Sequence, residues 1–498
     1  MTRLIERFRE VLALDSAAWA LEFEGKRRTW GELAQGAEVV AQALAELGAA
    51  PHDVIGWAAH NSPSAVVSLI GLVLSESCTA VINPHMAPKI LCDEIIRQRF
   101  PVIVGDPGFW KIPGVAAAAA AVGSAGMVVT WGAAVTTAPP HPGLGAIGAG
   151  PHREPMRDVV IERLSSGTTG PPKRSPQSAT ALINALRAGE RREAGAAQTA
   201  LTLKRSPAVV FRSLAHSGSF AVLLALYSAR PILLQEKFTV SDTVDAIREH
   251  RPKVISLVPT AIKMIWDAQV PPEDLASLVA IRSGTAPLDV QLQAKFEHKY
   301  GVPILVDYGA TEFGGVTSWS LEDHRLHAAS KRGSVGRVVA GAEIRVRDAE
   351  TGALIDDGRT GLLEVRVPRK GVDWISTNDL ASVDRDGFLY IRGRADDAIV
   401  RGGFKILPDE VVSVLRQHPD VQDAAVVGIP DQRLGQVPVA VIETRPDAAA
   451  PDEAGLRAFA REHLTPYQVP VAFKFIQRLP RTASMKVIRS EVLDIALG

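Results

Sequence analysis

The segment LSSGTTGPPKRSP, residues 164–176, gathers hydroxyl and glycine residues in front of a lysine. Gly167 and Gly170 let the backbone turn without side-chain obstruction, so successive N–H groups can point at one anion. Alone, this composition is equally typical of a Ser/Gly surface loop, and Pro171 and Pro172 prevent the lysine from opening a helix as in G-x-x-x-x-G-K-[ST]. Its candidate phosphate ligands are Ser165, Ser166, Gly167, Thr168, Thr169, Gly170 and Lys173.

The composition limits the classes of protein to consider. The chain has 498 residues, 46% of them hydrophobic, so it can bury a large core, and its length suggests about three domains or subdomains. Lys plus Arg and Asp plus Glu both number 55, and no strongly basic stretch predicts a nucleic-acid or anionic-membrane partner. We expect small polar ligands instead.

The cysteines and the apolar segments indicate a cytoplasmic protein. Cys78 and Cys92 form no C-x-x-C pattern, which fits a reducing compartment. Charges interrupt the apolar residues of the N-terminus, so no signal peptide is predicted. Residues 114–132 are uncharged but rich in Ala and Gly, and they predict a helix and a strand, with no integral membrane segment.

Hydrophobic periodicity predicts an α/β chain. Residues 30–48 have helical spacing behind Thr29, a candidate N-cap, with Glu32 completing a capping box. Short β-branched runs alternate with helical patterns up to a Pro/Gly/His-rich linker at 138–155, which favours parallel layers. Beyond Ile304, alternating strands predict a smaller β-rich subdomain, and a last α+β segment begins near Arg394.

Other catalytic motifs lack support. GLGAIG at 143–148 matches G-x-G-x-x-G, but no strand precedes it and no helix pattern follows it, so we interpret the match as accidental. The sequence contains no H-E-x-x-H, paired C-x-x-C or G-x-S-x-G. Metalloprotease, zinc-site and hydrolase interpretations therefore lose their main evidence.

Four segments in order carry a family resemblance: SSGTTGPPK, YGATE at 308–312, GRADDAIVRGGFKILPDEV at 393–411 and LPRTASMK at 479–486. They resemble the motifs of the adenylate-forming enzymes, which comprise acyl-CoA synthetases, peptide-synthetase adenylation domains and luciferases. Weaker similarity runs from Trp30 to the C-terminus. The resemblance implies an α/β N-terminal AMP-binding domain, 1–393, with two α/β subdomains and a β-rich subdomain, a hinge at 394–396, and a small mobile α+β C-terminal domain, 397–498.

The resemblance also implies roles for single residues. Lys486, Thr311 and Glu312 would be catalytic: Lys486 would bridge the carboxylate and the α-phosphate, Thr311 would contact the α-phosphate, and Glu312 would bind Mg²⁺. Tyr308 would pack on adenine, Asp379 would accept from both ribose hydroxyls, and Arg394 would reach the ribose or phosphate. Further nucleotide contacts would come from Ser283, Gly284, Thr285, Ala286, Pro287, Asp307 and Gly309.

The remaining assignments concern the acyl group, the thiol and the hinge. His216, Gly309 and Ala310 would line the acyl pocket, although a core histidine is an equal alternative for His216. Gly402, Gly403 and Lys405 would line the CoA tunnel, and Asp396 would be the hinge residue. Taken singly, each of these residues also fits a turn, a core or a solvated surface, and only the ordered motifs favour function.

Three positions depart from the family pattern. Asn378 replaces a glycine in Thr-Gly-Asp, and asparagine tolerates a left-handed conformation better than most residues. Met485 replaces the glycine before the lysine, and its bulk could reshape that loop. Arg174 replaces the glycine after the loop lysine, which would leave an extra positive charge near the phosphates.

Together these features predict a carboxylic acid–CoA ligase that uses ATP, Mg²⁺ and CoA and acts on an apolar aryl, alicyclic or medium-chain acid. Two alternatives stay open: an enzyme that loads the acyl group onto a separate carrier protein, and a catalytically weak nucleotide-binding protein. The motifs leave the acid unidentified because apolar pockets accept several acyl classes. They are compatible with a homodimer but leave the oligomeric state open.

Overall fold

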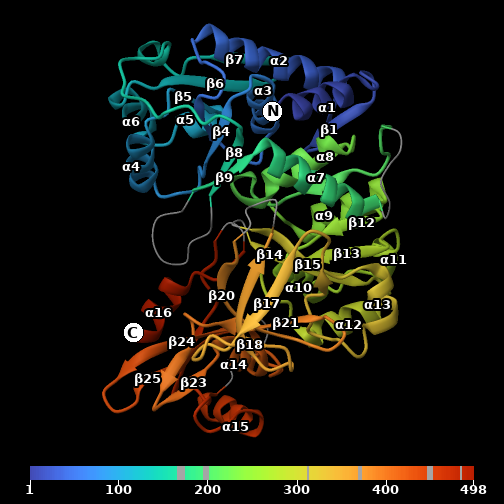
Figure 1. The fold of residues 1–498 in the computed structure, drawn as a ribbon, viewed down its shortest axis with the longest axis vertical. Coiled ribbons are helices and arrows are strands. Elements are labelled where there is room, and N and C mark those ends of the chain that lie inside the picture. The colour runs from blue at the N-terminus through green and yellow to red at the C-terminus, as the bar shows by residue number, and fades with distance from the viewer. Residues whose placement is uncertain (165–173, 195–200, 311–312, 368–372, 446–451, 483–484) are drawn as a thin grey trace. The chain divides into compact units, whose positions relative to one another are not determined.

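The computed structural model describes residues 1–164, 174–194, 201–310, 313–367, 373–445, 452–482 and 485–498. The chain forms two compact units, one built mainly from residues 1–281 and one from residues 282–498, with Leu257–Lys263 belonging to the second. In Figure 1 the first unit runs from blue to green and the second from yellow to red. Among the described residues, no helix is long and apolar enough to cross a membrane.

The helices begin and end as follows: α1 (Thr2–Ala13), α2 (Trp30–Glu46), α3 (Pro63–Leu74), α4 (Pro88–Gln98), α5 (Pro107–Trp110), α6 (Val115–Ala121), η1 (Pro142–Leu144), α7 (Ala179–Ala194), η2 (Leu214–Gly218), α8 (Ser219–Tyr227), α9 (Val240–His250), α10 (Pro259–Asp267), α11 (Pro272–Leu275), α12 (Val290–Tyr300), α13 (Leu321–His327), α14 (Pro408–Leu415), α15 (Glu453–His463) and α16 (Arg489–Leu497).

The strands are β1 (Trp19–Phe23), β2 (Lys26–Thr29), β3 (Val54–Ala58), β4 (Cys78–Ile82), β5 (Val102–Gly105), β6 (Ala125–Trp131), β7 (Val135–Ala138), β8 (Val159–Leu164), β9 (Arg174–Ser178), β10 (Ala208–Val210), β11 (Ile232–Leu234), β12 (Val254–Ser256), β13 (Ala280–Ser283), β14 (Ile304–Ala310), β15 (Gly314–Ser318), β16 (Arg337–Val338), β17 (Glu343–Arg347), β18 (Leu354–Ile355), β19 (Gly361–Arg366), β20 (Ile375–Val383), β21 (Leu389–Arg394), β22 (Ile399–Arg401), β23 (Phe404–Ile406), β24 (Val421–Asp431), β25 (Gly435–Thr444) and β26 (Ala472–Ile476).

A seven-stranded sheet of order β7-β6-β5-β3-β4-β8-β9 forms the centre of the first unit. Its inner strands are parallel and almost fully buried, because helices cover both faces. Val102 and Val104 of β5 pack with α2 and α3, whereas Ile103 packs with α4 and α6 on the opposite face. This alternation produces the three-layer arrangement that the sequence predicts.

The start of α2 shows how local sequence determines this architecture. The Thr29 side chain accepts a hydrogen bond from the Glu32 backbone N–H, and the Glu32 side chain accepts one from the Thr29 N–H. The predicted capping box is therefore confirmed. A second sheet of this unit has the order β10-β11-β1-β2. The other described strands of the unit are β12 and the first part of β13.

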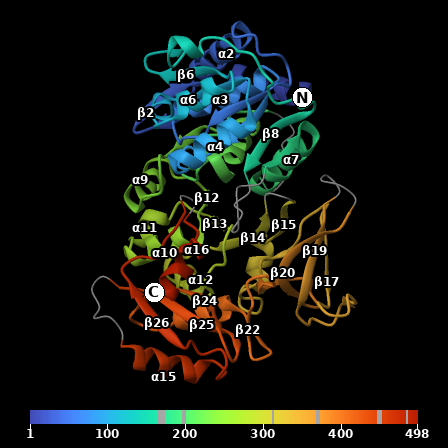
Figure 2. The same cartoon turned by 90° about the vertical axis from the view of Figure 1, so that its left-hand side faces the viewer.

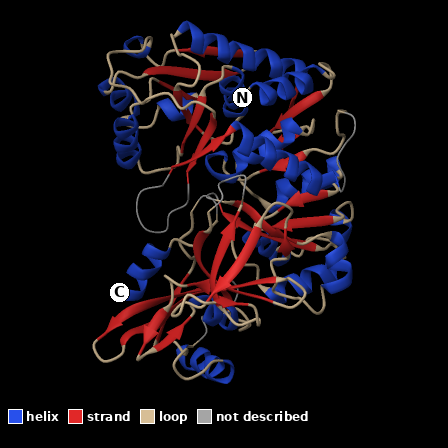
Figure 3. Cartoon of the chain, viewed as in Figure 1, coloured by secondary structure: helices blue, strands red, loops and turns tan. Residues whose placement is uncertain are grey.

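The second unit contains mainly antiparallel strands, which Figure 3 draws in red. β14 pairs antiparallel with β15, and β15 with β16. A five-stranded antiparallel sheet of order β18-β17-β19-β20-β21 follows, and this confirms the β-rich segment predicted beyond Ile304.

The last part of the chain forms an α+β sheet of order β23-β22-β25-β24, with β26 parallel to β25 (Figure 2). Val426 and Ala440 pack with α14 and α15 on one face, whereas Val427 and Val439 pack with α16 on the other. Alternation along the paired strands β24 and β25 thus buries both faces of this sheet. The predicted boundaries at 393 and 396 stay a prediction, since the division into two compact units falls elsewhere.

The segment 143–148 opens no helix. The structure has a short 3₁₀ turn at Pro142–Leu144, preceded by the antiparallel edge strand β7 and followed by irregular chain. The interpretation of GLGAIG as accidental is therefore confirmed, because the strand–turn–helix context is missing.

Candidate functional site

Asp379 lies at the centre of a polar cluster in the second unit. The Tyr308 hydroxyl donates a hydrogen bond to Asp379 Oδ2, and Arg394 Nη1 lies 3.5 Å from Asp379 Oδ1. Arg394 also donates to both carboxylate oxygens of Asp396, at 2.9 and 2.7 Å. Four residues that the sequence assigns to nucleotide binding and the hinge are thus brought together by the fold.

The backbone explains why these side chains meet. Asp379 in β20 is the direct antiparallel partner of Arg394 in β21. Asn378 adopts a left-handed conformation with φ of 59°, and its carbonyl accepts a hydrogen bond from Ala395 N at 2.8 Å. Asparagine tolerates this conformation better than most residues. Asn378 therefore has, within β20, the left-handed backbone that a glycine would also adopt.

The ionisable groups of the cluster lie in different environments, which shift their pKa values in different directions. Burial raises the pKa of Asp379, and the Tyr308 hydrogen bond and the Arg394 charge only partly oppose this effect. Burial and the neighbouring Asp379 raise the pKa of Tyr308. The hydrogen bond from Arg394 lowers the pKa of Asp396. Asp379 is thus a half-buried acceptor whose charged form further hydroxyl donors would stabilise.

The segment expected to form a pocket wall begins where β13 ends, at Ser283. A Cβ atom on Gly284 would lie 2.9 Å from the carbonyl oxygen of Asp307, so only glycine permits this approach. Thr285 has φ of 72°, a rare conformation for a β-branched residue. The Ser283 hydroxyl is buried and has no hydrogen-bond partner among the described residues. Such strain and unused polar capacity are typical of functional segments.

Asp307 and Gly309 are fixed by their neighbours. Asp307 Oδ1 accepts from Arg282 Nη1 at 3.3 Å and from the Ser318 hydroxyl. A Cβ atom on Gly309 would lie 2.3 Å from the carbonyl oxygen of Gly314 in β15. The expected nucleotide and acyl-pocket residues here occupy a strand pair that allows no larger side chain.

Lys486 is half-buried and belongs to a hairpin-like loop. Its backbone N–H donates to the Thr482 hydroxyl at 3.2 Å, and its carbonyl accepts from Thr482 N at 2.8 Å. Met485 has φ of 66°, so this methionine adopts the left-handed conformation that favours glycine. The departure from the family pattern therefore leaves the backbone turn in place and adds strain to it.

The expected CoA-tunnel glycines form the tight turn between β22 and β23. Gly402 and Gly403 have φ of 57° and 89°, and Gly402 N donates to the carbonyl oxygen of Leu434 at 2.8 Å. This turn presents backbone without side chains, which is what close passage of an extended thiol arm would require.

His216 lies in the first unit within η2, where its backbone is non-helical. A buried residue that sequence reasoning missed, Asn61, holds the preceding segment. Its amide donates to the carbonyl oxygens of Phe211 at 3.2 Å and Gln235 at 3.1 Å, and its oxygen accepts from Leu214 N at 2.9 Å. The available signal was a polar residue three positions after a buried strand, β3.

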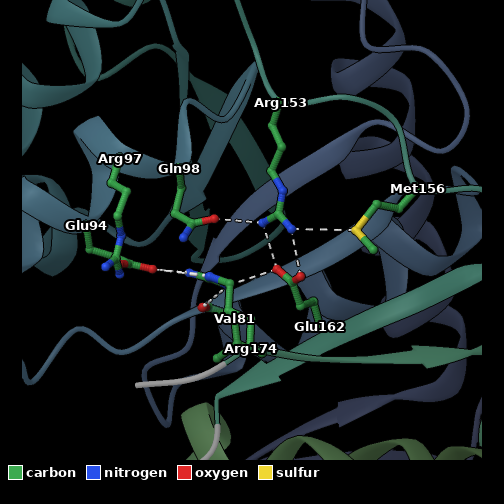
Figure 4. Close-up of polar contacts among 8 residues, drawn as sticks. All are labelled: Val81, Glu94, Arg97, Gln98, Arg153, Met156, Glu162 and Arg174. Atoms are coloured by element: carbon green, nitrogen blue, oxygen red, sulfur yellow. Dashed lines mark hydrogen bonds and ion pairs between the residues drawn. The ribbon is translucent and has the colours of Figure 1, made fainter. Parts of the chain in front are cut away.

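Arg174 does not leave a free charge beside the expected phosphate loop, which corrects the sequence-based expectation. Its guanidinium donates to Glu94 Oε1 at 2.8 and 3.1 Å, to Glu162 Oε2 at 3.3 Å and to the Val81 carbonyl at 3.1 Å (Figure 4). The Arg174 side chain is 9% exposed, and the Glu94 and Glu162 side chains are 6% and 3% exposed. Arg174 is therefore paired with two buried carboxylates.

Glu162 is shared with a second arginine. Arg153 pairs with both Glu162 oxygens at 2.7 Å, and Arg97, on the same helix as Glu94, pairs with Glu94 (Figure 4). The network thus ties α4, β8, β9 and the linker before β8 together within the first unit.

Several expected site residues lie outside the described residues: Ser165, Ser166, Gly167, Thr168, Thr169, Gly170, Lys173, Thr311, Glu312 and the side chain of Lys405.

Comparison with known families gives two matches. The model of the AMP-binding enzyme family matches residues 8–371, and that of the AMP-binding enzyme C-terminal domain matches residues 410–486.

Curated relatives are similar over much of the chain. A 2-succinylbenzoate–CoA ligase of Bacillus velezensis is 30% identical, over 69% of this chain and 70% of that protein. A long-chain-fatty-acid–CoA ligase of Bacillus subtilis is 29% identical, over 69% of this chain, and the match spans only 63% of the relative's length. The 4-coumarate–CoA ligase 3 of Oryza sativa is 30% identical, over 67% of this chain and 63% of that protein.

Solved structures share the fold. ATP-bound MatB from Rhodopseudomonas palustris superposes with a TM-score of 0.83 at 24% identity, covering 99% of this chain and 98% of that one. The o-succinylbenzoate coenzyme A synthetase of Bacillus subtilis, in complex with ATP and magnesium, superposes with a TM-score of 0.79 at 23% identity, covering 98% and 99%.

Proposed function

The chain belongs to the AMP-binding enzyme family, and from this premise we propose that it is an ATP-dependent carboxylic acid–CoA ligase. A carboxylate oxygen would attack the α-phosphorus of ATP, and pyrophosphate would leave. The CoA thiol, losing its proton, would then attack the acyl carbon of the adenylate, and AMP would leave with the bonding electrons of the C–O bond.

The first step brings two anions together, so the site must offset charge on both and stabilise an in-line transition state. Lys486 would supply the charge between the carboxylate and the α-phosphate, and Lys173 with the 165–170 segment would hold the outer phosphates. Mg²⁺, which favours carboxylate and phosphate oxygens, would neutralise phosphate charge beside Glu312. The metal role of Glu312 follows from the resemblance of the YGATE segment to the family motif, and the described carboxylates Asp379 and Asp396 are paired with Arg394.

The observation that carries the proposal is the Tyr308–Asp379–Arg394 cluster. An aromatic face, a half-buried carboxylate and a guanidinium from three strands fit the base, the hydroxyls and the phosphate side of a nucleotide. Because burial disfavours the charge on Asp379, hydroxyl donors from a ribose would gain more from this acceptor than from a solvated one.

CoA is the preferred acceptor in this proposal. The Gly402–Gly403 turn supports passage of a pantetheine arm, and the similar curated proteins are named as CoA ligases. Their names give a long-chain fatty acid, 2-succinylbenzoate and 4-coumarate as substrates, and we propose an apolar aryl, alicyclic or medium-chain acid for this chain. Loading of a separate carrier protein stays the alternative.

Pyrophosphate release measured over a panel of aryl, alicyclic and linear acids tests the proposal. We expect a subset of acids to release pyrophosphate with ATP and Mg²⁺, and mass spectrometry to show the matching acyl-CoA when CoA is added. Lys486→Ala serves as the control, because it should abolish the acid-dependent release. Transfer to a phosphopantetheinylated carrier but not to CoA would favour the alternative, and no release with any acid would contradict ligase activity.

A further inference from the structure

We propose that Arg481 is a positioning residue that clamps the backbone immediately before Lys486. The inference rests on the proposed function for the role of Lys486, whereas the clamp itself rests on contacts within the C-terminal sheet.

The Arg481 guanidinium holds both the loop and the sheet. Its Nη1 donates to the carbonyl oxygen of Met485 at 3.2 Å, and its Nη2 donates to Asp423 Oδ2. The side chains of Arg481 and Asp423 are only 12% and 8% exposed. The contact is therefore a partly buried, charge-assisted link, unlike a solvated surface pair.

Asp423 is a fixed anchor. It lies in β24, which pairs with β25 along most of its length, and its Oδ1 accepts from Arg416 Nε at 2.6 Å and from Ala424 N at 2.8 Å. Although burial opposes ionisation, the Arg416 and Arg481 charges hold the pKa of Asp423 below its usual range. The carboxylate is thus charged at neutral pH and ready to hold a cation.

The chain before the loop is tied to the same strand pair by further contacts. Glu443 in β25 accepts from Leu479 N at 2.8 Å, and its Oε2 lies 3.8 Å from Arg481 Nη2. Arg481 and Val487 form an isolated antiparallel bridge. The N-terminal arm of the segment that carries Lys486 is therefore fixed to the sheet, and its C-terminal end is fixed to that arm.

Met485 explains why a clamp is needed. Its φ of 66° is a conformation that residues other than Gly, Asn and Asp rarely adopt. A loop with this residue would relax toward other conformations unless its carbonyl were held, and the Arg481 hydrogen bond holds that carbonyl. The direction in which Lys486 leaves the backbone thus depends on Arg481.

The test uses four variants of the full-length chain. Arg481→Met removes the clamp, Asp423→Asn removes its anchor, and Arg481→Lys keeps the charge but not the forked geometry that reaches two acceptors. Arg478→Met is the matched control, because Arg478 is an exposed arginine three residues earlier on the same segment.

The first readout is tryptic cleavage of the Lys486–Val487 peptide bond under native conditions, which requires no substrate. We expect cleavage to be about tenfold faster in Arg481→Met and Asp423→Asn than in wild type, because proteolysis follows the population of the opened loop. The control should match wild type. Equal cleavage rates in Arg481→Met, Asp423→Asn and the control would overturn the clamp, even if the ligase proposal also fails.

The second readout separates the half-reactions. We expect Arg481→Met to slow ATP–pyrophosphate exchange by about 10- to 100-fold, because a misplaced catalytic group loses its alignment. Thioester formation from supplied acyl-AMP should stay within about twofold, since that step does not bring two anions together. Arg481→Lys should recover part of the exchange rate. Equal loss of both half-reactions, or loss of neither while wild type exchanges, would overturn the positioning role.

Discussion

Asp379 lies directly opposite Arg394 across the β20–β21 pair, and its two oxygens face different partners, the Arg394 guanidinium and the Tyr308 hydroxyl. The pairing of the two strands therefore brings together two residues that are 15 positions apart in sequence, and Arg394 donates to Asp379. Because the pairing of β20 with β21 sets this register, we expect a substitution of the Asp379 side chain to change the site without disturbing the sheet.

Asp379→Asn should weaken ATP binding while the fold is retained. The amide offers a single oxygen and no charge, so a loss of about 1–3 kcal/mol is expected, which is about a 5- to 150-fold rise in KM for ATP. Pyrophosphate release at varied ATP checks this. Ser382→Ala, a change at a buried hydroxyl of the same strand, is the matched control and should leave KM for ATP unaltered.

The raised pKa of Asp379 gives this carboxylate a signature in the pH dependence of stability. Burial raises the folded-state pKa above that of the unfolded chain, so the folded state binds more protons between the two values. The contribution of Asp379 to the free energy of unfolding must therefore fall as pH rises through this window, from about pH 4 upward. Thermal melts of wild type and Asp379→Asn across this range should show the decline in wild type only. A constant difference in Tm would contradict the raised pKa.

Met485→Gly should relieve strain in the Lys486 loop. The left-handed conformation costs about 1–2 kcal/mol for a non-glycine residue, and the flexibility of glycine in the unfolded chain offsets about 0.5–1 kcal/mol of the gain. We expect stability equal to or slightly above wild type and, if about 1 kcal/mol of strain reaches the transition state, an adenylation rate about fivefold higher. Met485→Ala is the control: it keeps the strain and removes only the bulk. Equal acceleration in the Ala and Gly variants would point to bulk alone.

Arg174→Met should destabilise the first unit without acting through the phosphates. It removes the charge-assisted hydrogen bonds to Glu94 and Glu162, but Glu94 keeps Arg97 and Glu162 keeps Arg153, so we expect a cost of about 1–3 kcal/mol. Arg97→Met, at a side chain 53% exposed, is the matched control and should cost less than about 1 kcal/mol. Urea denaturation measures both. If the Arg174 variant loses ATP affinity but no stability, the charge acts on the nucleotide after all.

The contrast between Arg174 and α2 shows what a sequence can predict. The Thr29–Glu32 capping box is a contact between near neighbours, so spacing alone identifies it. Arg174 pairs with Glu94, 80 residues away, and Arg481 with Asp423, 58 residues away. Nothing in local periodicity selects those partners, because they depend on which strands become adjacent in the sheet.

The two positions where another residue replaces an expected glycine could be predicted from the sequence, whereas the partners of the buried charges could not. The positions of Asn378 and Met485 were identified from the motif pattern alone, and both backbones adopt the left-handed conformation that a glycine would favour. A left-handed backbone conformation can therefore be predicted from the place of a residue in the motif, even when the residue is not glycine. The contacts that stabilise the turn, such as Arg481 on the Met485 carbonyl, required the fold.

Asp396→Pro tests whether the segment beside Arg394 acts as a hinge. In the proposed mechanism, Lys486 and the Gly402–Gly403 turn would serve one acyl group in succession, and rotation of the backbone at a few residues would exchange them. Proline fixes φ near −65°, so we expect pyrophosphate exchange to persist while acyl-CoA formation falls about tenfold or more.

Because Asp396 also holds Arg394 at 2.7 Å, Asp396→Ala is the necessary control: it removes that ion pair but leaves the backbone free. Both half-reactions measured on one preparation decide the matter. Loss of acyl-CoA formation in the proline variant alone supports a hinge, whereas the same loss in the alanine variant assigns the effect to the Arg394 ion pair.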